Sequence, residues 1–343
     1  MKNEDFAHLA ARIRALEPKL LNANELERML LAKSAKDAYK ILNELDYASH
    51  VGDIDDVSGF QEVINAGLKD SKDLIAKIAP YRWVFDVLWF RYDFHNIKTL
   101  LKAKLSGKTV EEVEDFLMPF GAIDLEKLKT YIVMEENTEF GIEKDHEEMV
   151  KKAIAKAVTE FEKTEDPQML DIFLDKKFCE ITLYIAKKSK HSFVIDLVKK
   201  YIDLKNLEAV VRIKIAGKEV AFLEKVLVEG GNMETKRFLE IFGKELSEMP
   251  EFLKHSEYAK VIAEGIKGFE EEKSLSKLEK YSYDHLTDFI QLAKRIPFGP
   301  EPIIGYFWAK KNNALIIRTI LVGKLNGFEP EEIKSKLRNL YSS

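Results

Sequence analysis

The sequence predicts an all-α protein, on the evidence of its composition and of a pattern that recurs three times. Charged residues make up 33% of the 343 residues, whereas Gly and Pro number only 16 and 9. This combination favours long helices with solvated faces, because a sheet protein needs more turn residues. Hydrophobic residues reach 46%, enough for a core, and the length is that of two or three domains.

Three stretches that resemble the last turns of a helix end at glycines 110 residues apart, Gly107, Gly217 and Gly327. Apolar residues precede each glycine at the i, i+3, i+4 and i+8 spacing of one helix face. They are, copy by copy, Ile97, Leu100, Leu101 and Leu105; Leu207, Val210, Val211 and Ile215; and Ile317, Ile320, Leu321 and Leu325. Glycine suits the position after a helix end, where a positive φ is inexpensive only without a Cβ. We therefore predict a helix that ends at each glycine.

A second helix is expected just beyond each glycine. After the first, Thr109 and Glu112 have the spacing of a capping box. After the third, Pro330 suits a first helical position, and acidic residues follow it. The repeated element is thus a helical hairpin.

Polar pairs recur upstream of the first two glycines. Asp93 and Asn96 in the first copy correspond to Asp203 and Asn206 in the second. Their spacing predicts that they precede the helix as a cap and a turn. The third copy has an asparagine and an isoleucine at these positions, Asn313 and Ile316, so we expect the polar device to be lost there.

The period defines three modules of pseudo-equivalent sequence, which we place at residues 12–121, 122–231 and 232–343. A period this long exceeds that of the common solenoids and matches a small domain. Three such modules can stack linearly or close around a pseudo-threefold axis, and the pattern alone does not choose between these arrangements.

Charge and cysteine content exclude several classes of protein. The net charge of −5 and the estimated pI near 5.9 argue against nucleic acid as a partner, which would require a basic footprint. Cys179 is the single cysteine, so no intrachain disulfide can form. Because the N-terminus lacks a secretory segment, a reducing cytoplasmic compartment is expected. No apolar stretch approaches the length of a membrane-spanning helix.

No motif for catalysis, cofactor binding or metal binding is present. The glycines are too dispersed for a phosphate-binding loop, and the seven histidines form no zinc spacing. Two single residues remain as candidates, and we interpret both as structural. His95, flanked by polar neighbours, is taken as a turn residue rather than a ligand, and Cys179 as a buried small hydrophobe. We therefore predict no catalytic, cofactor or metal residues, and pairs of neighbouring glutamates are taken as solvated helix faces.

Two aromatic clusters admit two interpretations, a partner-binding patch or a core, and we favour the core. The clusters are Tyr81, Trp83, Phe85, Trp89 and Phe90, and Tyr306, Phe307 and Trp308.

Four passages resemble the C subunit of archaeal and bacterial rotary A/V-type ATPases, which is homologous to the d subunit of the eukaryotic vacuolar enzyme. They are ARIRALEPKLLNANELERML (11–30), YDFHNIKTLLKAKLSGK (92–108), DIFLDKKF with YIDLKNLEAVVRIK (171–178 and 201–214), and AKRIPFGPEPIIGYFWAKKNNALIIRTILVGKLNG (293–327). The family-motif positions are Arg12 and Arg14, then Gly299, Glu301, Pro302, Tyr306, Arg318, Gly323 and Lys324. Arg12 and Arg14 diverge on a helix, so one of them is expected to face the surface or a partner. The chain departs from the family where Asn312, Asn313 and Ala314 stand in place of a frequent glutamate.

The resemblance implies a non-catalytic rotor subunit with three helical modules arranged as a funnel around a pseudo-threefold axis. It implies a peripheral position on the cytoplasmic side of the membrane of a prokaryote, in a complex that performs ATP-linked proton or sodium transport or ATP synthesis. Its implied partners are the axle subunits D and F of the central stalk and the membrane proteolipid ring, with one copy per complex. In isolation we expect a monomer that binds no nucleic acid and no small-molecule substrate.

Two alternatives remain open from the residues themselves. One is a generic α-helical repeat scaffold outside the motor, which would have soluble partners. The other is an all-α enzyme with an unrecognised site, which would need a polar pocket that the sequence does not indicate.

Overall fold

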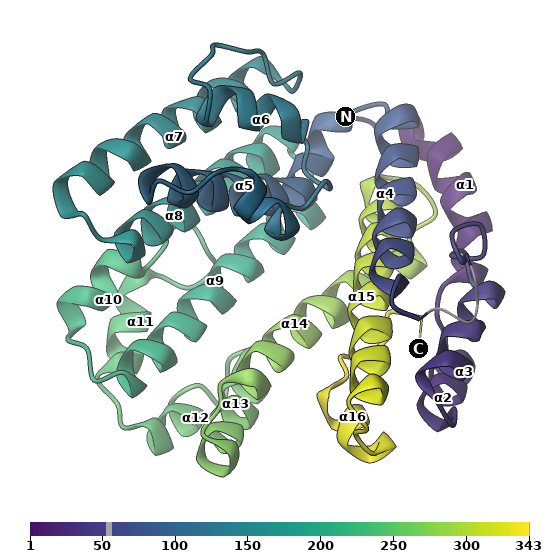
Figure 1. Ribbon diagram of the computed structural model, residues 1–343. Helices are drawn as coiled ribbons and strands as arrows, with labels where there is room; N and C mark the ends of the chain where they lie inside the picture. The colour runs from purple at the N-terminus through teal and green to yellow at the C-terminus, as the bar shows by residue number, and fades with distance from the viewer. Residues whose placement is uncertain (53–56, 343) are drawn as a thin grey trace. The chain divides into compact units, whose positions relative to one another are not determined.

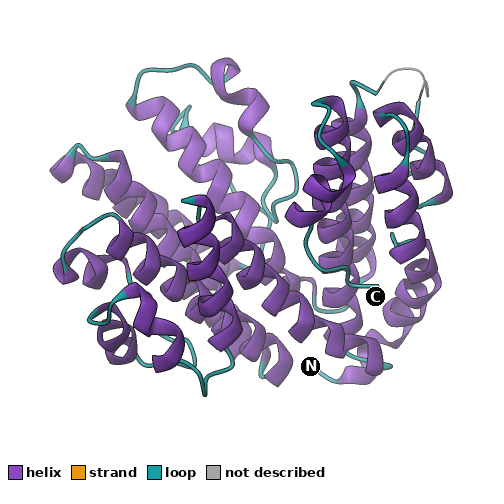
Figure 2. Cartoon of the chain, turned by 90° about the horizontal axis from the view of Figure 1, so that it is seen from below, coloured by secondary structure: helices purple, strands orange, loops and turns teal. Residues whose placement is uncertain are grey.

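The computed structural model describes residues 1–52 and 57–342. Within these ranges the chain forms helices joined by turns and contains no strand, as Figure 2 shows, so the predicted all-α class is confirmed. The chain forms two compact units: residues 1–80 together with 279–343 form unit 1, and residues 81–278 form unit 2. The division into three modules remains a prediction.

Unit 2 is organised around helix α8, which packs against α5, α7 and α9 (Figure 1). Short helices follow the long ones: α6 packs on α5, while α10 and α11 pack on α9. The helices that lie wholly in this unit are η4 (Arg82–Phe85), α5 (Asp86–Leu105), η5 (Glu111–Phe116), α6 (Leu125–Ile132), α7 (Lys144–Thr164), α8 (Pro167–Ser189), α9 (Ser192–Ile215), α10 (Val220–Val226), α11 (Thr235–Phe242), η6 (Leu246–Glu248), α12 (Met249–Phe252) and α13 (Ala259–Glu272).

Unit 1 is built around α15, which packs against α1, α3, α4 and η7. Of the 26 residues in α15, 20 are buried, so neighbours surround this helix on nearly every side. The boundary between the units falls near the start of α14 (Ser276–Ile290). The other helices of unit 1 are η1 (Asn3–Phe6), α1 (Ala7–Leu16), η2 (Glu17–Lys19), α2 (Ala23–Leu31), α3 (Ala35–Lys40), η3 (Ile41–Glu44), α4 (Phe60–Ile78), η7 (Gln291–Arg295), α15 (Pro300–Leu325) and α16 (Pro330–Lys336).

The predicted helix ends are confirmed. Gly107, Gly217 and Gly327 have φ values of 71°, 64° and 73° and directly follow the last turns of α5, α9 and α15. After Gly107 the N–H of Lys108 donates to the Ala103 carbonyl, and the same pattern of bonds recurs at the other two glycines. These bonds satisfy carbonyls that the helix itself leaves unpaired. A Cβ on any of the three glycines would meet no atom within 4 Å, so the positive φ is what favours glycine there.

The predicted second helices are also present, as η5, α10 and α16. The first is a 3₁₀-helix; there the Glu112 carboxylate accepts from the N–H of Thr109 at 2.8 Å, one half of the expected capping box. Pro330 occupies the first position of α16, as expected.

The second aromatic cluster lies in the core, and so do three residues of the first, whereas Tyr81 and Trp83 remain partly exposed. Phe85, Trp89 and Phe90 are fully buried, and the exposed fraction of Tyr306 and Phe307 is at most 2%. Cys179 is likewise buried, and desolvation raises the pKa of its thiol to about 12, so it behaves as a small hydrophobe.

Candidate functional site

The repeated polar residues lie in the middle of long helices and hold the loops that follow those helices. On α5, the buried Asp93 carboxylate accepts from the N–H of Ala122 at 2.7 Å and from that of Ile123 at 3.1 Å. One turn later the Asn96 amide both donates to the Met118 carbonyl and accepts from its N–H, at 2.8 Å each. Two side chains thus pair four backbone groups of one loop.

The second copy repeats this arrangement on α9. Asp203 accepts from the N–H groups of Asn232 at 2.9 Å and Met233 at 3.1 Å, and Asn206 pairs with both backbone groups of Val228. The Tyr258 hydroxyl donates a further bond to Asp203 at 2.8 Å. Desolvation raises the pKa of Asp203, and these hydrogen bonds oppose that rise.

The expectation that these pairs cap a helix start is therefore wrong. α5 begins at Asp86 and α9 at Ser192, so Asp93 and Asp203 lie about two and about three turns inside their helices. The apolar residues that precede each pair extend the helix upstream, because they can pack against the rest of unit 2. The Asp and Asn side chains consequently reach across to a distant loop.

Two glycines that the sequence interpretation missed make these contacts possible. A Cβ on Gly121 would stand 1.9 Å from Oδ1 of Asp93, and a Cβ on Gly231 would stand 1.9 Å from Oδ1 of Asp203. Neither glycine has a positive φ, so the constraint is the close approach of the carboxylate. Their spacing of 110 residues was a signal that could have found them.

A lysine completes each hairpin. Lys104 near the end of α5 donates to the Ile132 carbonyl at the end of α6, at 2.7 Å, and also contacts Glu135 at 2.6 Å. Lys214 makes the equivalent bond to the Phe242 carbonyl at the end of α11, at 3.1 Å. A cation at this position pairs terminal carbonyls and complements the helix dipole.

The third copy lies in unit 1. Asn313 on α15 is buried, and with its amide oriented to satisfy both groups it accepts from the N–H of Leu21 at 2.9 Å and donates to Ala309 at 3.2 Å. The expectation that the polar device is lost in this copy is therefore wrong at Asn313. Ile316 contributes only to the apolar core.

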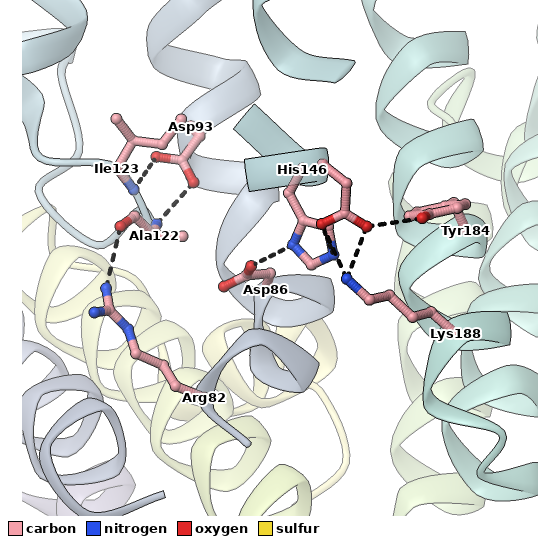
Figure 3. Close-up of polar contacts among 9 residues, drawn as sticks. Arg82, Asp86, Asp93, Ala122, Ile123, His146, Tyr184 and Lys188 are labelled. Carbon is pink, nitrogen blue, oxygen red and sulfur yellow. Dashed lines mark hydrogen bonds and ion pairs between the residues drawn. The ribbon is translucent and has the colours of Figure 1, made fainter. Parts of the chain in front are cut away.

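A second buried polar cluster in unit 2 centres on His146 (Figure 3). Its Nδ1 lies 2.9 Å from Oδ2 of Asp86, and both side chains are buried. Desolvation raises the pKa of Asp86, while the bond with His146 opposes that shift. Trp83 and Phe90 approach the imidazole edge-on, which encloses it in apolar surface.

Asp145, which precedes His146 on α7, binds α8. Its carboxylate accepts from Lys188 at 2.7 Å and from the Tyr184 hydroxyl at 2.7 Å. Burial raises the pKa of Asp145, but the bonds from Lys188 and Tyr184 outweigh it and hold that pKa at about 2. The result is an ion pair that fastens α7 to α8.

In unit 1 a buried lysine plays a comparable part. Lys310 on α15 lies 2.7 Å from Oδ1 of Asp46 and 3.9 Å above the ring of Tyr47. Desolvation lowers the pKa of this amine, and Asp46 opposes the shift. Removal of either partner would leave an uncompensated charge, so we expect the pair to be costly to break.

The family-motif residues have separate positions within unit 1. Arg14 donates to the carbonyls of Ala293 at 2.8 Å and Ile296 at 2.7 Å and so ties α1 to η7, while Arg12 is exposed. Glu301, Pro302 and Tyr306 are buried in the first turns of α15, and Arg318 is exposed on the same helix. The structure does not bring them together at one site. Of the two arginines expected to diverge, Arg12 is the one that faces solvent.

The described residues contain no group of three or more His, Cys, Asp or Glu side chains arranged to hold a metal ion. His95, the single candidate, is part-exposed, and its Nε2 lies 2.9 Å from the Phe116 carbonyl. It lies inside α5, so the expectation that it is a turn residue is wrong. Among residues 1–52 and 57–342, every helix is too short or too polar to cross a membrane. The polar side chains described above are thus engaged with backbone groups and with each other.

Comparison with known proteins shows similarity along nearly the whole chain. The family model of the ATP synthase (C/AC39) subunit matches residues 9–336. The C subunit of the A-type ATP synthase of Methanocaldococcus jannaschii is 28% identical over 352 aligned positions, which cover 98% of this chain and 86% of that protein. The C subunit of the V-type sodium ATPase of Enterococcus hirae is 24% identical, over 98% of this chain and 99% of that protein.

Proposed function

Because the chain belongs to the ATP synthase (C/AC39) subunit family, we propose that it is the central-stalk subunit of a rotary ATPase that couples the axle to the membrane ring. Its relatives are subunits of A-type ATP synthases and of a V-type sodium ATPase. The match over residues 9–336 is the observation that carries this proposal. The chain itself would perform no chemistry.

In this proposal the partners are the axle subunits D and F on one side and the proteolipid ring on the other. One copy sits peripherally on the cytoplasmic side of the membrane. The three modules form a funnel around a pseudo-threefold axis and transmit torque during ATP-linked transport of protons or sodium ions, or during ATP synthesis.

The polar contacts support a mechanical role. A coupler must transmit torque without shearing, so its helices need connections that resist sliding. Asp93 and Asp203 fasten loops to the middle of long helices, and Asp145 fastens α7 to α8. Directional hydrogen bonds to these carboxylates fix the register of the elements in a way that apolar contact alone does not.

The test is to tag the chain in its native cell, extract membranes in mild detergent and identify what co-purifies. Recovery of the axle subunits, the nucleotide-binding subunits and the proteolipid ring, with one copy of this chain, is expected. Recovery of soluble partners alone would refute the coupling role and favour a helical scaffold. The purified chain should also hydrolyse no ATP, and activity abolished by changing one of its own residues would contradict the proposal.

A further inference from the structure

The third helical hairpin is closed by the opposite end of the chain. We call α5, η5 and α6 triplet 1, α9, α10 and α11 triplet 2, and α15, α16 and α2 triplet 3. In triplets 1 and 2 the chain runs continuously from the long helix to the short one. In triplet 3 the long helix lies near the C-terminus, and the short helix α2 lies near the N-terminus.

Hydrogen bonds between side chains of the long helices and backbone N–H groups show that α2 is the equivalent of α6 and α11. In each triplet, the mid-helix polar side chain accepts from the residue just before the N-cap of the short helix. Ile123 precedes the N-cap of α6, Met233 that of α11, and Leu21 that of α2.

The lysine at the end of the long helix repeats the equivalence. Lys324 donates to the carbonyls of Leu30 at 2.8 Å and Ala32 at 2.6 Å, around the end of α2. Leu30 is 294 residues away from Lys324 in the sequence. Lys104 and Lys214 make the same kind of bond to α6 and α11.

Two substitutions make the closure of triplet 3 weaker than that of the other two. The neutral Asn313 stands where Asp93 and Asp203 each accept from two consecutive N–H groups. A hydrogen bond to a charged acceptor is roughly twice as strong as one to a neutral acceptor. Triplet 3 therefore lacks the strong anchor of the others.

The second substitution concerns the lysine. Three residues beyond the first accepting carbonyl, triplets 1 and 2 have Glu135 and Glu245, which lie 2.6 and 3.8 Å from Lys104 and Lys214. The same position in triplet 3 is Lys33, a like charge. Burial lowers the pKa of Lys324, and no carboxylate among the described residues opposes that shift.

We propose that residues 21–33 form a releasable strap that closes triplet 3 and opens in preference to the continuous triplets. No short loop joins α15 to α2, whereas such loops join the long and short helices of triplets 1 and 2. Only non-covalent contacts hold α2 against α15, so α2 can detach without strain on a connecting loop. Unit 1 would then open first by separation of the strap from α15, while triplets 1 and 2 remain closed.

Amide hydrogen exchange on the intact chain tests this proposal. We expect the amides of α2 to exchange at least about tenfold faster than those of α6 and α11, as local opening of a weakly held segment requires. Exchange in α2 that is as slow as in α6 and α11 would overturn the proposal.

Two charge changes separate release of the strap from general fraying of the chain end. Lys33→Glu restores the missing carboxylate and should slow exchange in α2 about threefold, the effect of one part-exposed ion pair. Glu135→Lys should accelerate exchange in α6 by a similar factor.

The exposed Lys69 on α4 offers the control, since Lys69→Glu changes the net charge by the same amount as Lys33→Glu and should leave exchange in α2 unaffected. Equal rates in α1 and α2, unchanged by Lys33→Glu, would indicate fraying and refute the strap.

Discussion

Gly121 lies so close to Asp93 that a Cβ on the glycine would stand 1.9 Å from Oδ1 of the carboxylate. The same relationship joins Gly231 and Asp203. In both places the absent side chain lets a buried carboxylate reach consecutive backbone N–H groups, so the glycine and the aspartate act as a pair.

Gly121→Ala should therefore be severely destabilising although the backbone conformation itself suits alanine. Either the Asp93 carboxylate must move and leave buried N–H groups unpaired, or the loop must shift. We expect a loss of about 3 kcal/mol in the free energy of unfolding, measured by urea denaturation. Gly243→Ala is the control, since its Cβ would approach nothing closer than 3.4 Å. Equal losses for the two variants would contradict the pairing.

Asp203→Ala should destabilise the chain more than Asp203→Asn. Alanine removes the acceptor of the part-buried N–H groups of Asn232 and Met233 and of the buried Tyr258 hydroxyl. The loss for the buried hydroxyl is about 1–3 kcal/mol, and it is smaller for the two N–H groups, which water can reach. Asparagine retains one carbonyl oxygen and should recover part of that loss. Urea denaturation of the two variants measures the difference, and indistinguishable midpoints would mean that the carboxylate does not hold the loop.

Gly217→Val should lower the melting temperature more than Lys218→Ala. Gly217 has φ of 64°, where a side chain costs about 1–2 kcal/mol and a β-branched one is strained further. Lys218 is exposed, and its truncation should change stability by less than about 0.5 kcal/mol. Equal melting temperatures would count against the role of Gly217 at the helix end.

Asp145→Asn should destabilise the chain at neutral pH and progressively less in acid. The pKa of Asp145 is lowered from 3.8 to about 2, so its stabilisation is fully present above pH 3.8 and is lost as pH falls through about 2. The side chain is 38% exposed, and after solvent screening we expect about 1 kcal/mol at pH 7.

At pH 3 about half of this difference should remain. Chemical denaturation of both proteins at pH 7 and pH 3 checks the trend. A gap between wild type and variant that grows on acidification would show that the ion pair with Lys188 is not its source.

The sequence by itself determined the all-α class, the three helix ends and the hairpin that follows each. These features depend on interactions within a few residues: the period of the apolar positions, and the positive φ that favours Gly107, Gly217 and Gly327. The buried aromatic clusters could also be anticipated, because large apolar side chains in a helical pattern favour burial.

Only the tertiary structure decided what the repeated polar residues do. Asp93 binds N–H groups 29 and 30 residues away, and Lys324 binds a carbonyl 294 residues away. Such contacts depend on how helices pack. The local spacing of Asp and Asn is compatible both with a cap at a helix start and with bonds from the middle of a helix to a distant loop, so it does not distinguish the two. The closure of the third hairpin by α2 has the same origin, because pairing between the two ends of a chain leaves no trace in any local pattern.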